Sequence, residues 1–442
     1  MTEITAQSGA GMDTTPTHIP RGRVLAWSLW DWGSAAFNAV VTTFVFTVYI
    51  TSSSFGDKDV ISAQLGWALA AAGLLIALLA PVTGQRSDVA GRRKFWLGVN
   101  TALVVALTAA MFFVEASPSY LLLGLVLVAS GNVFFEFAGV NYNAMLAQVS
   151  TPRTIGKVSG FGWGMGYLGG IVLLLIVYFG FIHPEVGWFG VTDANGLAVR
   201  VSMLISAAWF GLFALPLLLT VPEYRVPPQA RRERVGFFGS YVRLGRDIAR
   251  LWAVSRPTVW FLVASAIFRD GLAGVFTFGG VLAASVFGFS AGEVIIFAIA
   301  ANVVAGVATI SVGALDDRLG AKPVIVTALI GLVISAALIF LLHDGGQIVF
   351  WTAGLALCLF VGPAQSASRT FLARLIPPGR EGEVFGLYAT TGRAVSFLAP
   401  TAFAAFVGIF GATYWGILGI MLVLLAGLLA LLPVTAKQEQ LR

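Results

Sequence analysis

Six ionisable side chains stand inside stretches of the chain that are otherwise apolar. They are the acids Asp31, Glu136 and Asp270 and the bases Arg269, Arg369 and Arg393. An ionised side chain at the centre of a bilayer costs roughly 2.5–3.5 kcal/mol even on a lenient scale, so such residues face cavities and pair with opposite charges. Guanidinium groups bind carboxylates bidentately. The set therefore predicts a polar site for a small charged solute, with protons as a second candidate cargo.

The first of these acids, Asp31, lies near the start of its apolar stretch, in WDWGSAAFNA. Ala35 and Asn38 follow at i+4 and i+7, which on an α-helix makes a narrow face of small and polar residues. One interpretation is that Asp31 binds a proton or the ammonium group of a substrate. The alternative is a position at the membrane interface, flanked by tryptophans, where the carboxylate caps or pairs locally. The sequence leaves both open.

A polar stripe runs along the apolar stretch that contains Glu136. Asn132, Glu136 and Asn143 fall at i, i+4 and i+11, so they share one face of a helix. Glu136 is a proton carrier if its partner leaves during a functional cycle. The alternative is a permanent ion pair between helices. We favour the functional interpretation, because a carboxylate inside a membrane span is a functional residue by default.

The three arginines offer sites for a carboxylate. Arg269 directly precedes Asp270, and successive helical residues lie about 100° apart, so these two need not bond to each other. Arg369 is the strongest candidate, because Gln365 stands one turn before it and serines lie close by. Arg393 is the third candidate. The simpler alternative for each arginine is an ion pair with one of the three acids.

The composition is that of a membrane protein. Of 442 residues, 58% are hydrophobic and 11% charged, and the mean hydropathy is +0.88. At about 20 apolar residues for each helical span, the sequence predicts twelve spans, and hence an all-α membrane protein. The expected spans are 24–50, 62–83, 95–115, 120–148, 156–181, 198–221, 257–284, 293–315, 322–342, 348–374, 382–408 and 412–432.

The basic residues predict the orientation, because Lys and Arg are retained in short cytoplasmic loops. With both termini in the cytoplasm, that side collects 22 of the 27 Lys and Arg. The formal net charge of +6 then reflects this topological signal and favours contact with anionic lipid headgroups. A nucleic-acid site would need the basic residues on one folded face, so no nucleic-acid partner is expected. A single cysteine, Cys358, excludes a disulfide within the chain.

A ten-residue motif occurs twice. GQRSDVAGRR recurs as GALDDRLGAK 229 residues later, each time between the second and third span of a set of six. The spacing predicts gates, in which charge pairs and helix-end contacts form and break between two halves. Ordinary loop charge, the alternative, explains the bases but not the repeated Gly and Asp. The motif residues are Gly84, Asp88, Gly91, Arg92 and Arg93 in the first copy and Gly313, Asp317, Arg318, Gly320 and Lys322 in the second.

Two further pairings support an internal repeat. MLAQVSTPRTIGKVSG aligns with FLARLIPPGREGEVFG at an offset of 226 residues, and WDWGSAAF aligns less surely with RDGLAGVF, which places Asp31 opposite Asp270. The chain is therefore expected to form two six-helix halves. The expected divisions are a disordered tail (1–22), a first half (23–222), a cytoplasmic connector with an amphipathic helix (223–256), a second half (257–433) and a second tail (434–442).

Two parallel six-helix halves and the Gly-x3-Asp-x2-Gly-Arg motif resemble the major facilitator superfamily of transporters. The segments AWSLWDWGSAAF, SGFGWGMGYLGG, ALDDRLGAKPVI and QSASRTFLARLIPPGREGEVFGLY are similar to its vacuolar-effluxer (autophagy-related) branch, whose eukaryotic members release amino acids from the vacuole. The resemblance covers nearly the whole chain. It implies a secondary transporter that moves a small polar solute, such as an amino acid or a related zwitterion, by alternating access.

Other functions fit less well. The histidines His18, His183 and His343 all lie outside the expected spans, which argues against an enzyme with an intramembrane histidine or metal site. The glycine-rich run in the fifth span lacks the lysine of a phosphate loop, which argues against pumping driven by ATP. No cofactor is expected. Efflux of a drug-like or lipophilic compound and a receptor that does not transport remain alternatives. We expect a monomer that binds a small-molecule substrate within the lipid bilayer. Since the resemblance extends to bacterial relatives of the effluxer branch, it implies a bacterial plasma (inner) membrane.

Overall fold

The computed structural model describes residues 19–223, 236–289, 291–376 and 380–435. Most of the two expected tails, and residues 224–235 of the expected connector, lie outside the described residues. Within the described residues, twelve helices are long and apolar enough to span a membrane, which confirms the twelve expected spans. Helices are the natural outcome for such sequences, because a backbone in lipid must satisfy its own hydrogen bonds.

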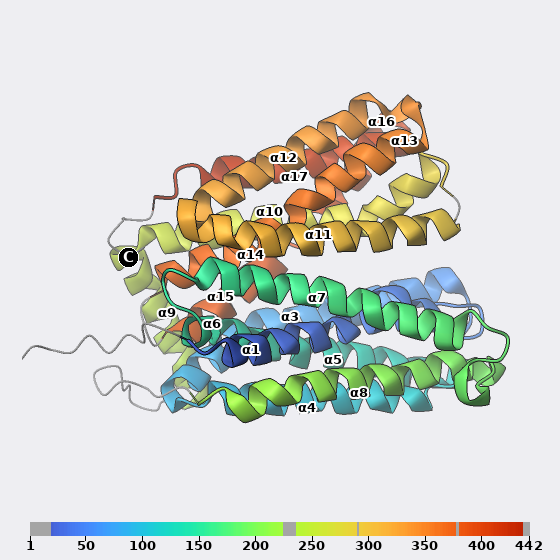
Figure 1. The fold of residues 1–442 in the computed structure, drawn as a ribbon, viewed down its shortest axis with the longest axis horizontal. Helices are drawn as coiled ribbons and strands as arrows, with labels where there is room; N and C mark the ends of the chain where they lie inside the picture. Colours follow the sequence, from blue (N-terminus) through green and yellow to red (C-terminus); the bar gives the residue numbers. More distant parts are fainter. Residues whose placement is uncertain (1–18, 224–235, 290, 377–379, 436–442) are drawn as a thin grey trace, which may run out of the picture.

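The first six spans form one group of helices, shown in blue to green in Figure 1. Their helices are α1 (Arg21–Ala35), a π-helical segment (Ala36–Phe44), α2 (Phe46–Ile50), α3 (Lys58–Ala90), α4 (Arg93–Ala110), α5 (Leu121–Ala144), α7 (Ile155–Val177) and α8 (Leu197–Thr220), with the short α6 (Leu146–Val149) between the fourth and fifth spans. The helix α9 (Phe237–Val254) then leads to the remaining spans.

The last six spans form a second group, which Figure 1 shows packed along the first. Their helices are α10 (Arg256–Ser285), α11 (Ala291–Leu319), α12 (Ala321–Leu341), α13 (Gln347–Val349), α14 (Leu355–Leu375), α15 (Glu381–Ala394), α16 (Leu398–Phe410) and α17 (Gly416–Leu431), with a π-helical turn (Phe350–Gly354) joining α13 to α14. We call the two groups the first half and the second half.

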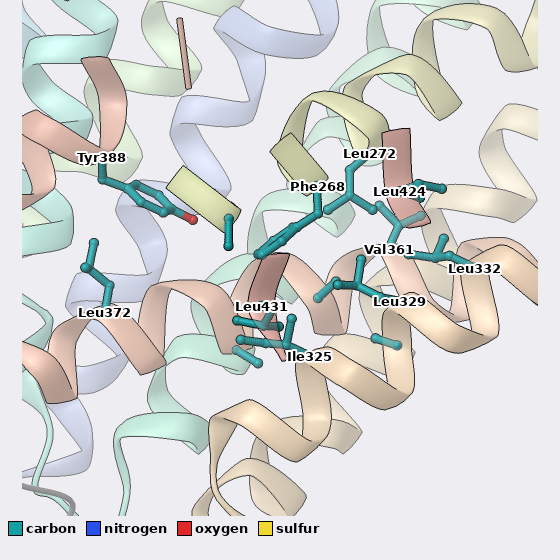
Figure 2. Packing of buried hydrophobic residues seen from close by; sticks show 14 of the residues in the cluster. Phe268, Leu272, Ile325, Leu329, Leu332, Val361, Leu372, Tyr388, Leu424 and Leu431 are labelled. Atoms are coloured by element: carbon teal, nitrogen blue, oxygen red, sulfur yellow. The ribbon is translucent and has the colours of Figure 1, made fainter. Parts of the chain in front are cut away.

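Each half has its own hydrophobic core. One cluster of buried apolar side chains lies within the first half, and a second lies mainly within α10–α17. Figure 2 shows part of the second cluster, where Phe268 of α10, Leu329 of α12 and Leu424 of α17 point toward one another. The second cluster also includes side chains of α3 and α5, because the two halves meet there.

Two helix pairs make the main contact between the halves. α3 packs along α15, and α7 packs along α11. The glycine-rich run of α7 faces both α1 and α11: a Cβ at Gly160 would lie 2.6 Å from the carbonyl oxygen of Thr309, and one at Gly162 would lie 2.7 Å from the ring of Trp27. Small residues on this helix are therefore required for close packing on two sides.

One side of the bundle carries α9, α6 and the first turns of α1, α7 and α15 (Figure 1). We call it the connector side. The loops there are shorter than the sequence analysis assumed. α3 continues to Ala90 and α11 to Leu319, so Gly84, Asp88, Gly313 and Asp317 lie on helices rather than in loops. Hydropathy marks where the apolar run ends, whereas the helix continues until a glycine breaks it.

The two spans that contain Asp31 and Arg393 are not regular helices. The first span changes from α-helix to π-helix at Ala36 and is interrupted at Val45. The eleventh span breaks between Ala394, where α15 ends, and Leu398, where α16 begins. Interrupted helices leave backbone groups unpaired inside the membrane, and in transporters such breaks lie near the binding site.

Candidate functional site: charge networks between the halves

On the connector side, Asp88 of α3 holds the first turn of α15 in the other half. Its Oδ1 accepts a hydrogen bond from the backbone N–H of Gly382 (3.1 Å), and its Oδ2 accepts one from Glu383 (2.9 Å). These N–H groups belong to the second and third residues of the helix, which have no partner within it. A carboxylate at a helix N-terminus is also stabilised by the helix dipole.

Arg93 completes this network. Its Nε lies 2.6 Å from Asp88 Oδ1, and its Nη2 lies 2.6 Å from Oε2 of Glu381, across the boundary between the halves. The Arg93 side chain is fully buried. Asp88 belongs to the same half as Arg93, so the pair Arg93–Glu381 is the ion pair of this network that joins the two halves. Asp88 keeps the buried guanidinium paired with a charge of opposite sign when the halves separate.

Asp317 makes the same contact in the opposite direction. From α11 of the second half, its Oδ1 accepts a hydrogen bond from the N–H of Gly156 (2.6 Å), and its Oδ2 accepts one from Lys157 (2.9 Å), at the start of α7 in the first half. The repeat pairs Asp88 with Asp317 and Gly156 with Gly382. The two networks are thus related by the internal repeat.

The glycines of the motif have identifiable roles. Gly91 (φ 63°) and Gly320 (φ 89°) adopt the positive φ at which each helix ends. Gly313 lies against Gly156, where a Cβ would come within 2.7 Å of the Gly156 carbonyl oxygen, and a Cβ at Gly84 would lie closer still to the carbonyl oxygen of Gly382. Because Gly84 and Gly313 have no side chain, the paired helices approach closely enough for Asp88 to reach the start of α15 and for Asp317 to reach the start of α7.

The remaining motif bases do not cross between the halves in the described contacts. Arg92 is exposed and lies 6.0 Å from the ring of Phe95, and Arg318 is exposed. The Nζ of Lys322 donates to the carbonyl oxygen of Leu432, at the end of α17 in its own half. Among the expected gating bases, Arg93 is therefore the one with a contact to an acid of the other half within the described residues.

Arg374 is the arginine of the second network, and the sequence analysis assigned it no role. Its Nη1 lies 2.6 Å from Oδ1 of Asp316, and its Nη2 lies 3.2 Å from Oδ1 of Asp317. Glu381, which binds Arg93, was also missed. The repeat was a usable signal for both residues. FLARLIPPGREGEVFG contains Arg374 and Glu381, and the segment that aligns with it in the first half contains the start of α7, which Asp317 binds.

Deeper in the bundle, Arg369 of α14 reaches into the first half. Its Nη1 lies 3.6 Å from Asp31 Oδ2 and 3.2 Å from Asn143 Oδ1. Its Nε donates to the hydroxyl of Ser159 (3.0 Å), and its Nη2 donates to the Ser159 carbonyl oxygen (2.7 Å). Arg369 precedes Arg374 by five residues, about 7.5 Å along an α-helix, so this cluster lies beneath the connector-side networks.

Asp31 therefore has a partner in the other half. Besides Arg369, its Oδ2 accepts a hydrogen bond from the hydroxyl of Tyr142 (2.9 Å). Asn38 is not part of this cluster in the described contacts: its side chain is exposed, and its carbonyl oxygen accepts hydrogen bonds from Thr42 and Thr43. The shared face predicted for Asp31 and Asn38 assumed α-helical spacing, which ends at Ala35.

A second pair of opposite charges lies farther from the connector side. Nη2 of Arg393 lies 2.8 Å from Glu136 Oε1 and 3.2 Å from Asn132 Oδ1. The side chains of Arg393 and Glu136 are 34% and 31% exposed, although both residues lie within membrane spans. The polar stripe on α5 therefore meets two arginines of the second half, Arg393 through Asn132 and Glu136, and Arg369 through Asn143.

Arg269 and Asp270 point to different partners, as their angular separation suggested. The guanidinium of Arg269 lies 3.7 Å from the ring centroid of Tyr388 and donates to its carbonyl oxygen (3.0 Å). Oδ2 of Asp270 accepts a hydrogen bond from the N–H of Ala399 (2.6 Å), in the first turn of α16. Asp270 thus caps the helix that begins at the break in the eleventh span.

Gln365 also bridges the halves. Its Oε1 accepts a hydrogen bond from the hydroxyl of Tyr167 on α7 (2.9 Å). It does not contact Arg369 in the described hydrogen bonds, although it stands one turn before it on α14. Six of the ten predicted site residues thus form two clusters, one centred on Arg369 and the other on Arg393. The other four belong to neither cluster in the described contacts: Asn38, Arg269, Asp270 and Gln365.

Comparison with known proteins supports the architecture. The uncharacterized MFS-type transporter YxiO of Bacillus subtilis (strain 168) is 26% identical over 411 residues, which cover 92% of this chain and 93% of YxiO. Autophagy-related protein 22 of Cryptococcus neoformans var. neoformans serotype D (strain B-3501A) is 25% identical over 287 residues, or 61% of this chain. The aligned region spans about half (51%) of that fungal protein.

Solved structures share the fold. The proton:xylose symporter XylE, bound to 6-bromo-6-deoxy-D-glucose, superposes with a TM-score of 0.75 over 94% of this chain and 95% of its own, at 16% identity. A bacterial homologue of the iron transporter ferroportin, in its outward-facing state, gives 0.67 over 94% and 99% at 15% identity. These are structures of transporters of the major facilitator superfamily or of their homologues, and none is an enzyme.

The family described as vacuole effluxer Atg22-like matches residues 148–441, about two thirds of the chain. The matched segment includes Asp317, Arg369 and Arg393, and it contains the second-half block that carried the resemblance in the sequence. The chain belongs to this family, a branch of the major facilitator superfamily of secondary transporters.

Proposed function

We propose that this transporter moves a small zwitterionic solute, with amino acids as the first class to test, and that it does so by alternating access coupled to protons. The binding position is the space between the halves at Glu136, Asn132 and Arg393. We further propose that the protein works as a monomer in a bacterial plasma membrane, with the connector side in the cytoplasm.

The observation that carries this proposal is the pair Glu136–Arg393. It combines a carboxylate from the first half with a guanidinium from the second, and about a third of each side chain is accessible. A zwitterion offers a carboxylate for Arg393 and an ammonium group for Glu136, so it can replace the internal pair without leaving a charge uncompensated. Asn132 supplies an additional acceptor at the same place.

Alternating access follows from the connector-side networks. Asp88 and Asp317 each hold a helix start of the opposite half, and Arg93 binds Glu381 across the boundary. With these contacts formed, the halves are locked together on the connector side. Their release would let the halves separate there, while a rigid-body rotation closes the opposite side.

Proton coupling rests on Glu136. Protonation removes the charge that holds Arg393, so a proton and a solute compete for the same internal pair. Asp31 and Asp270 are less suited to this role in the present conformation, because Asp31 lies beneath the connector-side networks and Asp270 serves a helix start. Each remains a candidate that amide substitution can test.

The test is uptake of a radiolabelled amino-acid mixture into proteoliposomes, with and without an imposed pH gradient. We expect accumulation that depends on the gradient, and its loss in Glu136→Gln, because this variant removes both the proton site and the partner of the solute's ammonium group. Glu115→Gln is a matched control, because Glu115 also pairs with an arginine (Arg200, 3.4 Å) but within one half.

Two results would count against the proposal. Folded wild-type protein that gives no flux above empty liposomes would overturn amino-acid transport. Gradient-driven accumulation that persists in Glu136→Gln would overturn the coupling role of Glu136, and the same experiment with Asp31→Asn and Asp270→Asn would then examine the other two acids.

A further inference from the structure

We propose that the first half contains a binding cage for an organic cation, and that Arg369 occupies this cage in the present conformation. When the halves separate on the connector side, Arg369 withdraws and the cage accepts a guanidinium or alkylammonium group of a solute. The inference rests on the proposed alternating access, and it adds a second position that recognises the cationic end of the solute.

Three aromatic rings lie near the Arg369 guanidinium. Its Cζ lies 5.0 Å from the ring centroid of Trp27, 5.6 Å from Trp163 and 5.8 Å from Tyr142. Both faces of Tyr142 are covered by Trp27 and Trp30, so the rings that attract the cation are those of Trp27 and Trp163. Cations within about 6 Å of a ring centroid are attracted by the ring quadrupole, and several rings around one cation form the cage that recognises ammonium ligands. The carboxylate of Asp31, 3.6 Å from Nη1, supplies a full negative charge at the same place.

Every wall of this cage belongs to the first half. Trp27 and Asp31 lie on α1, Tyr142 on α5, and Trp163 on α7. Ser159 of α7 adds a hydroxyl and a carbonyl oxygen as acceptors. Arg369 is the group that the second half inserts. A rigid-body separation of the halves would therefore leave the cage intact and remove its occupant.

The cage is held in shape by contacts that do not involve Arg369. Tyr142 is stacked between Trp27 (4.4 Å between centroids) and Trp30 (4.3 Å). The indole of Trp27 donates to the Tyr142 carbonyl oxygen (3.3 Å), and the Tyr142 hydroxyl donates to Asp31 (2.9 Å). Trp30 is fixed in turn by Thr101 (3.0 Å). A preorganised site binds a ligand without an ordering cost.

The other two predicted site arginines inside the membrane spans lack these surroundings. Arg393 is held by Glu136 and Asn132, with no aromatic ring in its described contacts, and Arg269 contacts the single ring of Tyr388. The combination of two rings and a carboxylate is specific to the position of Arg369 among these three. Arg393 therefore provides a matched control for the removal of an arginine between the halves.

The experiment uses full-length Arg369→Ala in detergent, titrated with guanidinium chloride at concentrations far below those that unfold proteins. Intrinsic tryptophan fluorescence is the signal, because Trp27 and Trp163 line the cage. Sodium chloride controls for ionic strength, and tetramethylammonium chloride is the second probe. We expect saturable binding with a half-saturation concentration at least fivefold lower in Arg369→Ala than in wild type or in Arg393→Ala. Adding Asp31→Asn should abolish this difference.

Identical titrations of Arg369→Ala, Arg393→Ala and wild type would overturn the cage. Arg369→Gln, which keeps a donor for Ser159, is the second variant if the alanine protein does not fold. The assay requires no flux, so the two proposals fail separately. Cation binding by Arg369→Ala without wild-type transport would refute only the proposed transport function, and transport without such binding would refute only the cage.

Discussion

Asp88 accepts a hydrogen bond from the backbone N–H of Gly382, 294 residues away in the chain and in the other half of the molecule. Asp317 does the same with Gly156, over 161 residues. Each half thus offers a carboxylate to the helix start of the other, and this reciprocity explains why the motif occurs twice.

Removal of the Asp88 carboxylate should open the connector side. Loss of a helix cap costs about 1 kcal/mol, so Asp88→Ala should raise connector-side accessibility about fivefold or more. The measurement is the labelling rate of Ser366→Cys by a membrane-impermeant maleimide in a Cys358→Ala background. Ser366 is buried and its hydroxyl meets Ser159 of the other half (3.0 Å). Asp344→Ala, an exposed acid, is the control.

The two caps should act independently. Asp88 and Asp317 lie on different helix pairs and share no described partner, so their effects on the closed state should add within about 0.5 kcal/mol. The double variant Asp88→Ala/Asp317→Ala should therefore show a labelling rate close to the product of the two single effects. A double variant no faster than either single one would mean that one cap alone controls closure.

A methyl group at Gly313 should prevent full closure. A Cβ there would lie 2.7 Å from the carbonyl oxygen of Gly156, closer than real Cβ atoms approach, and backbone atoms cannot move aside locally. Overpacking of this kind costs about 1–3 kcal/mol. In the Ser366→Cys protein, Gly313→Ala should raise the rate of maleimide labelling. Gly73→Ala, whose added Cβ would meet no atom within 4 Å, should leave that rate unchanged. Equal labelling would show that α11 can shift without opening the interface.

Substitution of one member of the Glu136–Arg393 pair should destabilise the fold more than substitution of both. Glu136→Gln leaves Arg393 without its carboxylate, but both side chains are about a third exposed, so the loss should be only about 1 kcal/mol. Glu136→Gln/Arg393→Gln should recover part of the thermal stability while uptake stays lost. A double variant less stable than either single variant would contradict an ion pair of this kind.

Asp270 allows a structural role to be separated from proton transfer. Asp270→Ala should lower stability by about 1 kcal/mol through loss of the cap at Ala399, whereas Asp270→Asn keeps an acceptor oxygen and should remain close to wild type. Thermal unfolding in detergent measures both. If Asp270→Asn is stable but loses pH-driven accumulation, Asp270 carries a proton as well as capping α16.

Sequence reasoning found most of the residues that form the two clusters. Asp31, Asn143 and Arg369 meet in one cluster, and Asn132, Glu136 and Arg393 meet in the other. It did not find Ser159, Tyr142, Trp27 or Glu381, because nothing in their local sequence distinguishes a serine or aromatic residue that meets a buried charge from one that packs in a core. It also placed Asp88 and Asp317 in loops, since hydropathy does not report where a helix ends.

The sequence by itself determined the twelve spans, the repeat and the presence of compensated charges inside the membrane. These properties are local or periodic: a run of about 20 apolar residues is required to cross the bilayer, and each buried charge requires an opposite one. Only the tertiary structure decided which charges meet. Arg393 and Glu136 are 257 residues apart, and Arg369 and Ser159 are 210 apart. Their contact depends on how two rigid halves are rotated against each other, and no short stretch of sequence encodes that rotation.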